Sequence, residues 1–188
     1  MDGQGVASRR SARGFTLVES LTVLAASAAL LTLAVPSVGA LAGSMRLTSA
    51  ANDLLADILF TRAEALKRRV RVVLCKSADG LACMAAGGWH QGWIVFVDDD
   101  GDGLRAPTEA VLQRQPALGG SVQLVGNGTV SRYLAYAPDG ATRLVGGGFQ
   151  AGTFTVCRDV AGPAPARQIV ISASGRPRVQ KVTAESCA

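Results

Sequence analysis

An apolar run without charged residues fills most of the first quarter of the chain. Residues 20–44 contain no Asp, Glu, Lys or Arg, and about 20 apolar residues suffice to cross a bilayer as a helix. Three arginines precede the run, namely Arg9, Arg10 and Arg13. Because positive charge is biased toward the cytoplasmic side of a membrane, the pattern predicts a transmembrane segment over about residues 15–40 with a cytoplasmic N-terminus.

One charged residue, Glu19, lies at the start of this run. An ionised group in hydrocarbon costs at least about 2.5–3.5 kcal/mol, and such groups usually pair with a partner inside an assembly. Glu19 also interrupts the apolar stretch that a secretory signal peptide would need, which argues against such a peptide. The acid therefore either has a partner in an assembly or lies unpaired at headgroup depth.

Beyond residue 44 the apolar positions recur at helical spacing, and charged residues lie elsewhere around the helix. The apolar set is Leu47, Ala51, Leu54, Ile58 and Ala65, and the charged set is Asp53, Asp57, Arg62 and Glu64. The basic residues 67–69 suit a helix C-terminus, where cations interact favourably with the helix dipole. The pattern predicts a helix over residues 15–69, apolar all round in its first half and amphipathic in its second.

From about residue 70 the pattern becomes that of short β-strands. Seven stretches alternate or are rich in β-branched residues, and Gly, Pro and Asp separate them. They are RVRVVLC, GWIVFVD, AVLQRQ, SVQLVG, RYLAYAP, GTFTVCRD and RQIVISAS, and the stretch DVAGPAPAR is expected to be irregular. Strands that follow one long helix predict an α+β fold, with a β-rich domain over residues 70–188.

The N-terminal sequence RGFTLVESLTVLAASAALLTLAVP resembles that of type IV prepilins. The resemblance implies a leader peptide over residues 1–14, cleavage by a prepilin peptidase between Gly14 and Phe15, and N-methylation of Phe15. In this family a glutamate at the fifth position of the mature chain meets the N-terminal amine of a neighbouring subunit, and Glu19 matches that position. Pro36 matches the helix-kinking proline that pilins commonly carry.

The rest of the chain resembles the minor pilins and pseudopilins called FimT, FimU and GspH. The motifs that carry this resemblance are RAEALKRRVRVVLCKS, GWIVFVDDDGDG, YAPDG, GTFTVC and IVISASGRPRV. It implies a scarce subunit, anchored in the inner membrane with a periplasmic domain, that joins other major and minor pilins at a pilus tip and helps to initiate assembly. The alternative is a GspH-like pseudopilin of a type II secretion system, whose partners are pseudopilins and exported proteins.

Nothing in the sequence supports an enzyme. His90 is the only histidine, and it lies between two tryptophans in GGWHQGW. A hydrolase that depends on histidine needs a nucleophile, a base and an orienting group close together. We therefore expect a structural assembly protein without a cofactor.

The four cysteines fit an exported chain, because disulfides form in oxidising compartments such as the periplasm. Their spacing in the sequence favours the pairs Cys75–Cys83 and Cys157–Cys187, although four cysteines allow three pairings. A metal site is the rival interpretation. The spacings are not those of a zinc motif, and the chain has one histidine.

The stretch DDDGDGLRAPTE carries the letters of a calcium loop. Asp98, Asp100 and Asp102 occupy the first, third and fifth positions, Gly103 the sixth and Glu109 the twelfth. The flanking patterns are those of strands, so an EF-hand with flanking helices is not expected. The stretch is either a Ca²⁺ site or a solvated acidic turn.

The C-terminal stretch SASGRPRVQK predicts a hairpin, with a turn at Gly175 and a strand after it. Arg176 and Arg178 share one face by the alternation of a strand, and Lys181 follows them. Gly175, Arg176 and Arg178 also match a Gly-Arg-x-Arg motif of FimT-like proteins, which implies binding of double-stranded DNA for uptake in natural transformation. The alternative is a solvated or ion-paired basic hairpin. Arg158 and Arg167 are candidates to widen the basic patch.

Overall fold

The computed structural model of the chain describes residues 14–158, 160 and 162–187, with the backbone alone for 33–38 and 40. Most of the expected leader peptide, including its three arginines, lies outside the described residues. The chain divides into two units, one ending at Ala42 and the other beginning at Gly43.

Helix α1 (Leu17–Arg68) agrees with the predicted helix to within two residues at each end. At its start the backbone N–H of Glu19 donates to the hydroxyl of Thr16, at 3.2 Å, which satisfies one of the free N–H groups of the first turn. At its end Arg69 has a positive φ of 58°, and its N–H donates to the carbonyl of Ala65 at 2.9 Å. A residue in this left-handed conformation is a common helix stop.

The first unit contains a series of apolar side chains that are more than half exposed. They are Phe15, Leu17, Val18, Leu21, Val23, Leu24, Leu30, Leu31 and Leu41. Within the described part of the chain, no helix has both the length and the apolar character that a membrane crossing requires. The transmembrane segment expected over residues 15–40 therefore stays a prediction.

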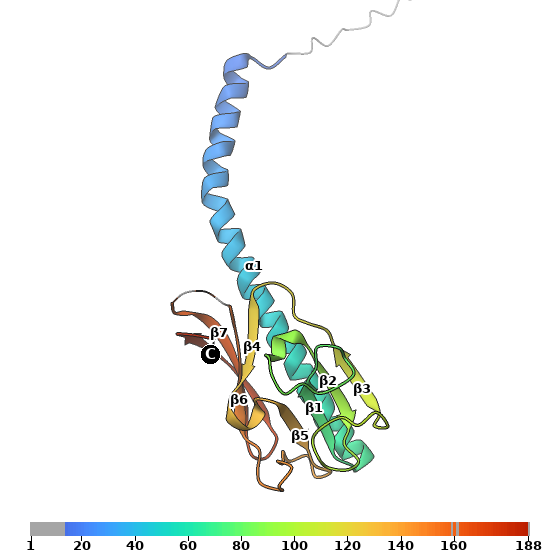
Figure 1. Cartoon of the computed structure of the whole chain (residues 1–188). Coiled ribbons are helices and arrows are strands. Elements are labelled where there is room, and N and C mark those ends of the chain that lie inside the picture. The colour runs from blue at the N-terminus through green and yellow to red at the C-terminus, as the bar shows by residue number, and fades with distance from the viewer. Residues whose placement is uncertain (1–13, 159, 161, 188) are drawn as a thin grey trace, which may run out of the picture. The chain divides into compact units, whose positions relative to one another are not determined.

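The second unit contains two antiparallel four-stranded sheets (Figure 1). The first sheet has the order β3-β2-β1-β5, built from β1 (Val72–Lys76), β2 (Trp93–Val97), β3 (Val111–Gln115) and β5 (Tyr133–Tyr136). The second has the order β4-β6-β7-β8, built from β4 (Val122–Gly126), β6 (Gly152–Arg158), β7 (Ala164–Ile171) and β8 (Pro177–Ala184). All seven predicted stretches form strands, and β8 is the strand expected after the hairpin turn.

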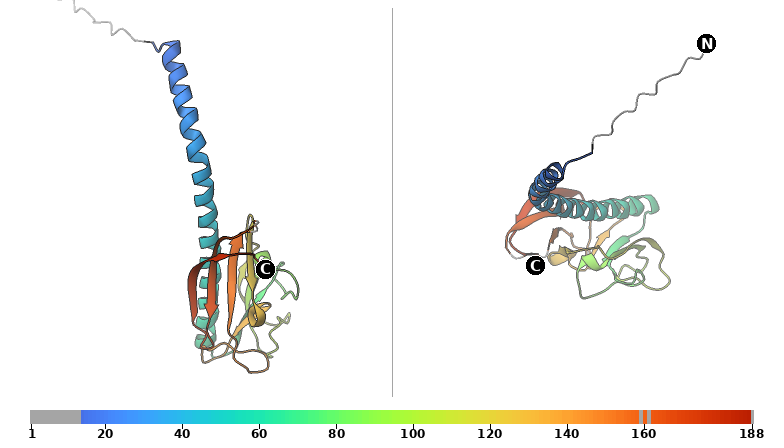
Figure 2. Two further views of the ribbon diagram at one scale, coloured as in Figure 1. Left: turned by 90° about the vertical axis from the view of Figure 1, so that its left-hand side faces the viewer. Right: turned by 90° about the horizontal axis from the view of Figure 1, so that it is seen from above.

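The main hydrophobic core joins the second half of α1 to both sheets. Leu47, Leu54 and Ile58 of the helix pack in one cluster with apolar residues of both sheets. Figure 2 shows this part of α1 alongside the strands. Because one helix stripe covers two sheets, the amphipathic pattern of residues 47–65 is satisfied without a second helix. The fold is α+β, as the sequence predicts.

The first sheet is buried on its other face as well. There Val73, Cys75, Ile94, Phe96 and Ala135 form a second cluster. Every residue of β1 and β2 is consequently buried, which explains why these two strands are continuous rather than alternating apolar runs.

Both disulfides have the pairing favoured by the sequence, Cys75–Cys83 and Cys157–Cys187. The first closes the loop after β1, where the buried ammonium of Lys76 donates to the carbonyl of Gly87 at 2.8 Å. Burial lowers the pKa of Lys76 below its ordinary value. The second disulfide ties the C-terminal segment to β6.

Candidate functional site

The β7–β8 hairpin turns at residues 172–176, with Gly175 at its sharpest point. Gly175 has a φ of 75°, and its N–H donates to the carbonyl of Ser172 at 2.8 Å. The hydroxyl of Ser172 accepts the N–H of Arg176 at 3.2 Å. These bonds hold the backbone of Arg176 in a fixed turn.

Gly175 itself is buried against β5 and the turn that follows it. A Cβ on Gly175 would lie 2.5 Å from the carbonyl oxygen of Gly140 and 2.7 Å from Cε1 of Tyr136. The hydroxyl of Tyr136 donates to the carbonyl of Gly175 at 2.8 Å. Gly175 therefore positions the hairpin, and its expected contact with DNA stays a prediction.

The hairpin separates the three basic residues that the sequence grouped together. Arg176 and Arg178 are both exposed, and within the described residues no hydrogen bond or ion pair engages either guanidinium. Arg178 lies opposite Val170, and Lys181 lies opposite Arg167. Since Arg178 and Lys181 are three positions apart, they point to opposite faces of the sheet. Lys181 is therefore not part of the pair formed by Arg176 and Arg178.

Arg158 and Arg167 do not widen the patch at the turn. A Cβ on Gly43 would lie 2.9 Å from Nη1 of Arg158, and Nη2 of Arg167 lies 3.4 Å from the hydroxyl of Thr48. Both arginines thus face the α1 residues nearest to Gly43. The sequence offered them only as candidates, since it does not fix the faces on which they lie, and the structure brings them to another part of the domain.

A different arginine, Arg62 of α1, lies near the hairpin. Its Nε would be 3.3 Å from a Cβ on Gly140, and Gly140 in turn contacts Gly175. Sequence reasoning missed Arg62, Tyr136 and Gly140 as neighbours of the motif. No local signal identifies them, because α1, β5 and the hairpin meet only through the tertiary fold.

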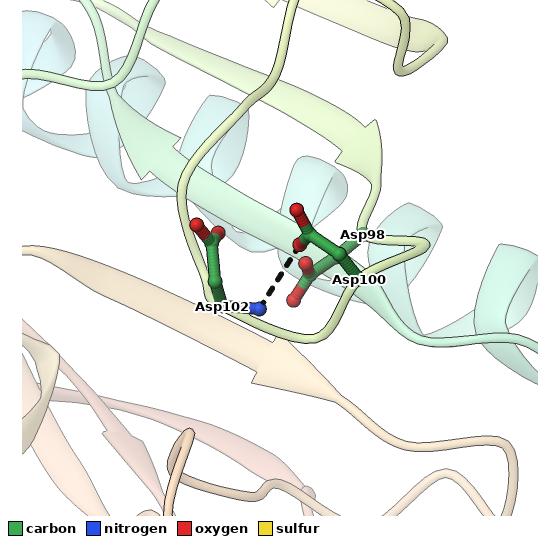
Figure 3. A group of neighbouring side chains, drawn as sticks. All are labelled: Asp98, Asp100 and Asp102. Carbon is green, nitrogen blue, oxygen red and sulfur yellow. Dashed lines mark hydrogen bonds between the residues drawn. The ribbon is translucent and has the colours of Figure 1, made fainter.

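The acidic loop brings three of its four expected ligands together. Carboxylate oxygens of Asp98, Asp100 and Asp102 lie within 4.8 Å of one another (Figure 3). Glu109 does not join them. Its carboxylate accepts hydrogen bonds from the backbone N–H groups of Asp99 and Ala106, each at 2.8 Å. Glu109 therefore binds the backbone of its own loop.

Asp98 already has partners for its buried carboxylate. Nε of Arg71 lies 2.7 Å from Oδ2, and the N–H groups of Gly101 and Gly103 donate at 3.0 and 3.2 Å. Burial raises the pKa of Asp98 above its ordinary value, while Arg71 and the two N–H groups act in the opposite sense. The Arg71 guanidinium compensates the negative charge of Asp98, which a bound cation would otherwise do. The geometry therefore favours an acidic turn over a Ca²⁺ site.

Two acidic residues expected on the polar side of α1 are instead buried. Asp57 accepts a hydrogen bond from Nε1 of Trp93 at 2.8 Å. Glu64 is buried beside Arg68 and Lys67, and the hydrogen bond from Arg68 is the main cause that lowers the pKa of Glu64. The helical pattern places both acids away from the apolar stripe, but these partners allow their burial.

The expected processing and assembly residues lie at the start of the described chain. Gly14 precedes α1, Phe15 is exposed, and Glu19 is exposed in the first helical turn. In residues 14–158, 160 and 162–187 no side chain pairs with the Glu19 carboxylate.

Comparison with solved structures identifies the fold. Two crystal forms of the type IV minor pilin FimU from Pseudomonas aeruginosa (strain PAO1) match with TM-scores of 0.57 and 0.54, at 20% and 22% sequence identity. Each match covers 76% of this chain, and the two cover 95% and 100% of the FimU chains. The chain thus has the fold of a minor pilin.

The model of the family described as type II transport protein GspH matches residues 50–175. The chain belongs to this GspH family. No curated protein sequence matches it. Members of the family are minor pilins or pseudopilins, structural proteins rather than enzymes, and the family implies assembly with other pilins or pseudopilins.

Proposed function

We propose that the chain is a minor type IV pilin that joins the filament through α1 and helps to initiate pilus assembly. The exposed apolar side chains of residues 15–31 carry this proposal. Contiguous exposed apolar surface is unfavourable in water and marks a contact with another protein or a membrane. In this proposal the surface lies in the inner membrane before assembly and against other pilins afterwards.

Processing between Gly14 and Phe15 by a prepilin peptidase, with N-methylation of Phe15, belongs to the same proposal. The new amine of Phe15 would form an ion pair with the Glu19 carboxylate of a neighbouring subunit. The cost of an unpaired carboxylate in hydrocarbon, at least about 2.5–3.5 kcal/mol, favours this pairing. The chain is then single-pass, with its N-terminus in the cytoplasm and its domain in the periplasm.

An additional role in DNA binding for uptake is proposed for Arg176 and Arg178. Two exposed guanidiniums on a turn fixed by Tyr136 and Gly175 suit phosphate oxygens, because guanidinium donors match phosphate geometry. The proposal concerns contacts to the backbone of double-stranded DNA, which position a protein without reading the sequence.

A role as a type II secretion pseudopilin is the second candidate, and the description of the matching family favours it. The two roles differ in partners. Co-purification of the tagged full-length chain with pilus subunits supports the first role, and co-purification with secretion pseudopilins and exported proteins supports the second.

The DNA role is tested by a mobility-shift assay on the purified full-length chain in detergent, with double-stranded DNA at several salt concentrations. The test variant is Arg176→Gln with Arg178→Gln. The matched control is Arg167→Gln with Lys181→Gln, which removes two charges from the same hairpin on the other face of the sheet. We expect the DNA affinity of the test variant to be at least about tenfold lower. The magnitude of the slope of log affinity against log salt should decrease by about 1.8, as for the loss of two phosphate contacts.

Circular dichroism should show that both variants fold. If the test variant binds DNA as tightly as the control variant and the parent, the DNA role fails at this motif.

A further inference from the structure

Arg167 and Lys181 lie directly opposite each other on β7 and β8. Like charges at directly opposite positions destabilise a sheet. The Arg167 guanidinium donates to the carbonyl of Ala166 at 3.2 Å and to the hydroxyl of Thr48 at 3.4 Å. Neither cation forms an ion pair with a carboxylate among the described residues. The pair therefore attracts an anion that the domain itself does not provide.

The two cations line a cavity of about 220 Å³ between α1 and β8. The helix contributes the hydroxyl of Thr48 and the amide of Asn52 to its wall. The two cations and the amide are donors suited to the oxygens of a phosphate group, whereas the Thr48 hydroxyl donates to the carbonyl of Ser44 at 3.0 Å. The polar part of the wall suits an anion of that chemistry, and Ala51 and Val179 form an apolar part beside it.

The cavity lies close to the end of the uncharged run at residues 20–44. Thr48 follows Ser44 by four residues, which is about 6 Å along a helix. The headgroup layer on each side of a bilayer is about 5–7 Å thick. If the run ends at the hydrocarbon boundary, as the proposed membrane anchor requires, the cavity lies at the depth of the lipid phosphates. Arg158 lies against the same stretch of α1 at Gly43.

We propose that the cavity between α1 and β8 binds the phosphate group of an anionic phospholipid through Arg167 and Lys181. The contact holds the folded domain against the leaflet from which α1 emerges, before the subunit enters a filament. This inference rests on the membrane anchor of the proposed function, and it is separate from DNA binding at Arg176 and Arg178.

The test uses the full-length chain reconstituted into nanodiscs of phosphatidylcholine or of phosphatidylcholine mixed with phosphatidylglycerol. Unfolding is followed through the fluorescence of the buried Trp89 and Trp93. We expect the Tm to be higher by about 2–4 °C with phosphatidylglycerol, because a ligand that binds only the folded state stabilises it. Arg167→Gln with Lys181→Gln should abolish this difference, whereas Arg176→Gln with Arg178→Gln should preserve it.

Two further measurements separate lost binding from lost folding. In neutral detergent the Arg167→Gln, Lys181→Gln variant should melt no lower than the parent, since it relieves a like-charge pair. Arg167→Lys, which keeps the charge, should retain most of the phosphatidylglycerol effect. A loss in Arg167→Lys equal to that of the double variant contradicts binding through charge.

The remaining outcomes identify the anion and the anchor. Inorganic phosphate that reproduces the full stabilisation in detergent would show a site for free anions and overturn the lipid assignment. An equal Tm in the two kinds of nanodisc overturns the inference while the anchor stands. A chain that does not float with vesicles of either composition overturns both the anchor and the inference.

Discussion

The hydroxyl of Tyr136 donates a 2.8 Å hydrogen bond to the carbonyl oxygen of Gly175. Tyr136 ends β5 of the first sheet, and Gly175 lies in the turn between β7 and β8 of the second. The bond therefore links the two sheets at the position where Arg176 leaves the turn. Burial raises the pKa of Tyr136 well above its ordinary value of 10.0, so the phenol stays protonated and remains a donor.

Replacing Tyr136 by Phe should loosen the hairpin without changing the charge of the domain. The buried carbonyl of Gly175 loses its donor, and a buried acceptor left unsatisfied costs about 1–3 kcal/mol. We expect a lower free energy of unfolding in urea and weaker DNA binding. Tyr133→Phe is the matched control, because the Tyr133 hydroxyl accepts an exposed N–H of Val145 far from the turn. Equal DNA affinity in the two variants would mean that Tyr136 does not position the arginines.

Gly175→Ala should destabilise the domain for two reasons that can be separated. Its φ of 75° strains an L-residue, and its Cβ would collide with the carbonyl oxygen of Gly140 at 2.5 Å. We expect a loss of roughly 1–3 kcal/mol in the free energy of unfolding. Gly147→Ala is the control, since Gly147 has a φ of 83° but nothing lies within 4 Å of its Cβ position. If the two variants lose equal stability, the contact with Gly140 contributes nothing.

The stability of the chain should depend on pH through Asp57. Burial raises the pKa of this carboxyl in the folded chain above the ordinary value of 3.8, and the hydrogen bond from Trp93 opposes the shift. The folded state therefore binds the proton more tightly than the unfolded state. The resulting stabilisation is complete below pH 3.8 and is lost as the pH rises through the pKa of the folded chain.

Asp57→Asn tests this dependence, because Asn can still accept the Trp93 N–H but does not titrate. Urea unfolding of variant and parent should be measured from below pH 3.8 to neutral pH. The stability of the variant relative to the parent should increase with pH over the interval above 3.8 and then become constant. Asp102→Asn, an exposed acid without contact to Trp93, is the control. A flat difference for Asp57→Asn contradicts the shift.

Much of the fold could be predicted from periodicity. The helical spacing of Leu47, Leu54 and Ile58 and the β-branched stretches correspond to observed elements. The division into two sheets could not be predicted, because it depends on the pairing of β4 with β6 rather than with β3. The strand β7 also begins inside the stretch expected to be irregular, at Ala164. Pro165 is tolerated there because it lies beyond the part of β7 that pairs with β6.

The candidate sites were predictable where residues are close in sequence. The three aspartates of the acidic loop converge, and the arginines of the hairpin are exposed together. Strand alternation predicts that Lys181 and Arg178 point to opposite faces of the sheet. Lys181 was grouped with Arg178 only because the two residues are close in sequence. The burial of Asp57 depends on Trp93, which is 36 positions away, and no local pattern indicates such a partner.

The acidic loop should be stable without a cation. Arg71 and two N–H groups already compensate Asp98, and Glu109 binds backbone rather than facing the three aspartates. We expect millimolar Ca²⁺ to change the Tm of the chain by less than about 1 °C, a shift too small to indicate binding. A larger rise that EDTA reverses, and that Asp100→Asn with Asp102→Asn removes, would establish a calcium site instead.

Glu19→Ala should separate processing from assembly. Cleavage occurs at the Gly14–Phe15 bond, which the substitution does not change. We therefore expect the variant to be cut and methylated like the parent, and mass spectrometry of the mature N-terminus measures this. Without the carboxylate, however, no ion pair forms with the amine of the neighbouring subunit. Transfer of the Glu19→Ala chain from the bilayer to the filament then lacks this favourable electrostatic free energy. Its amount in sheared pili should therefore fall at least about tenfold, which corresponds to about 1.4 kcal/mol. Glu19→Asp keeps the charge and should restore part of the incorporation, whereas Gly14→Val should abolish cleavage itself. Normal incorporation of the cleaved Glu19→Ala chain would show that the acid is tolerated rather than paired.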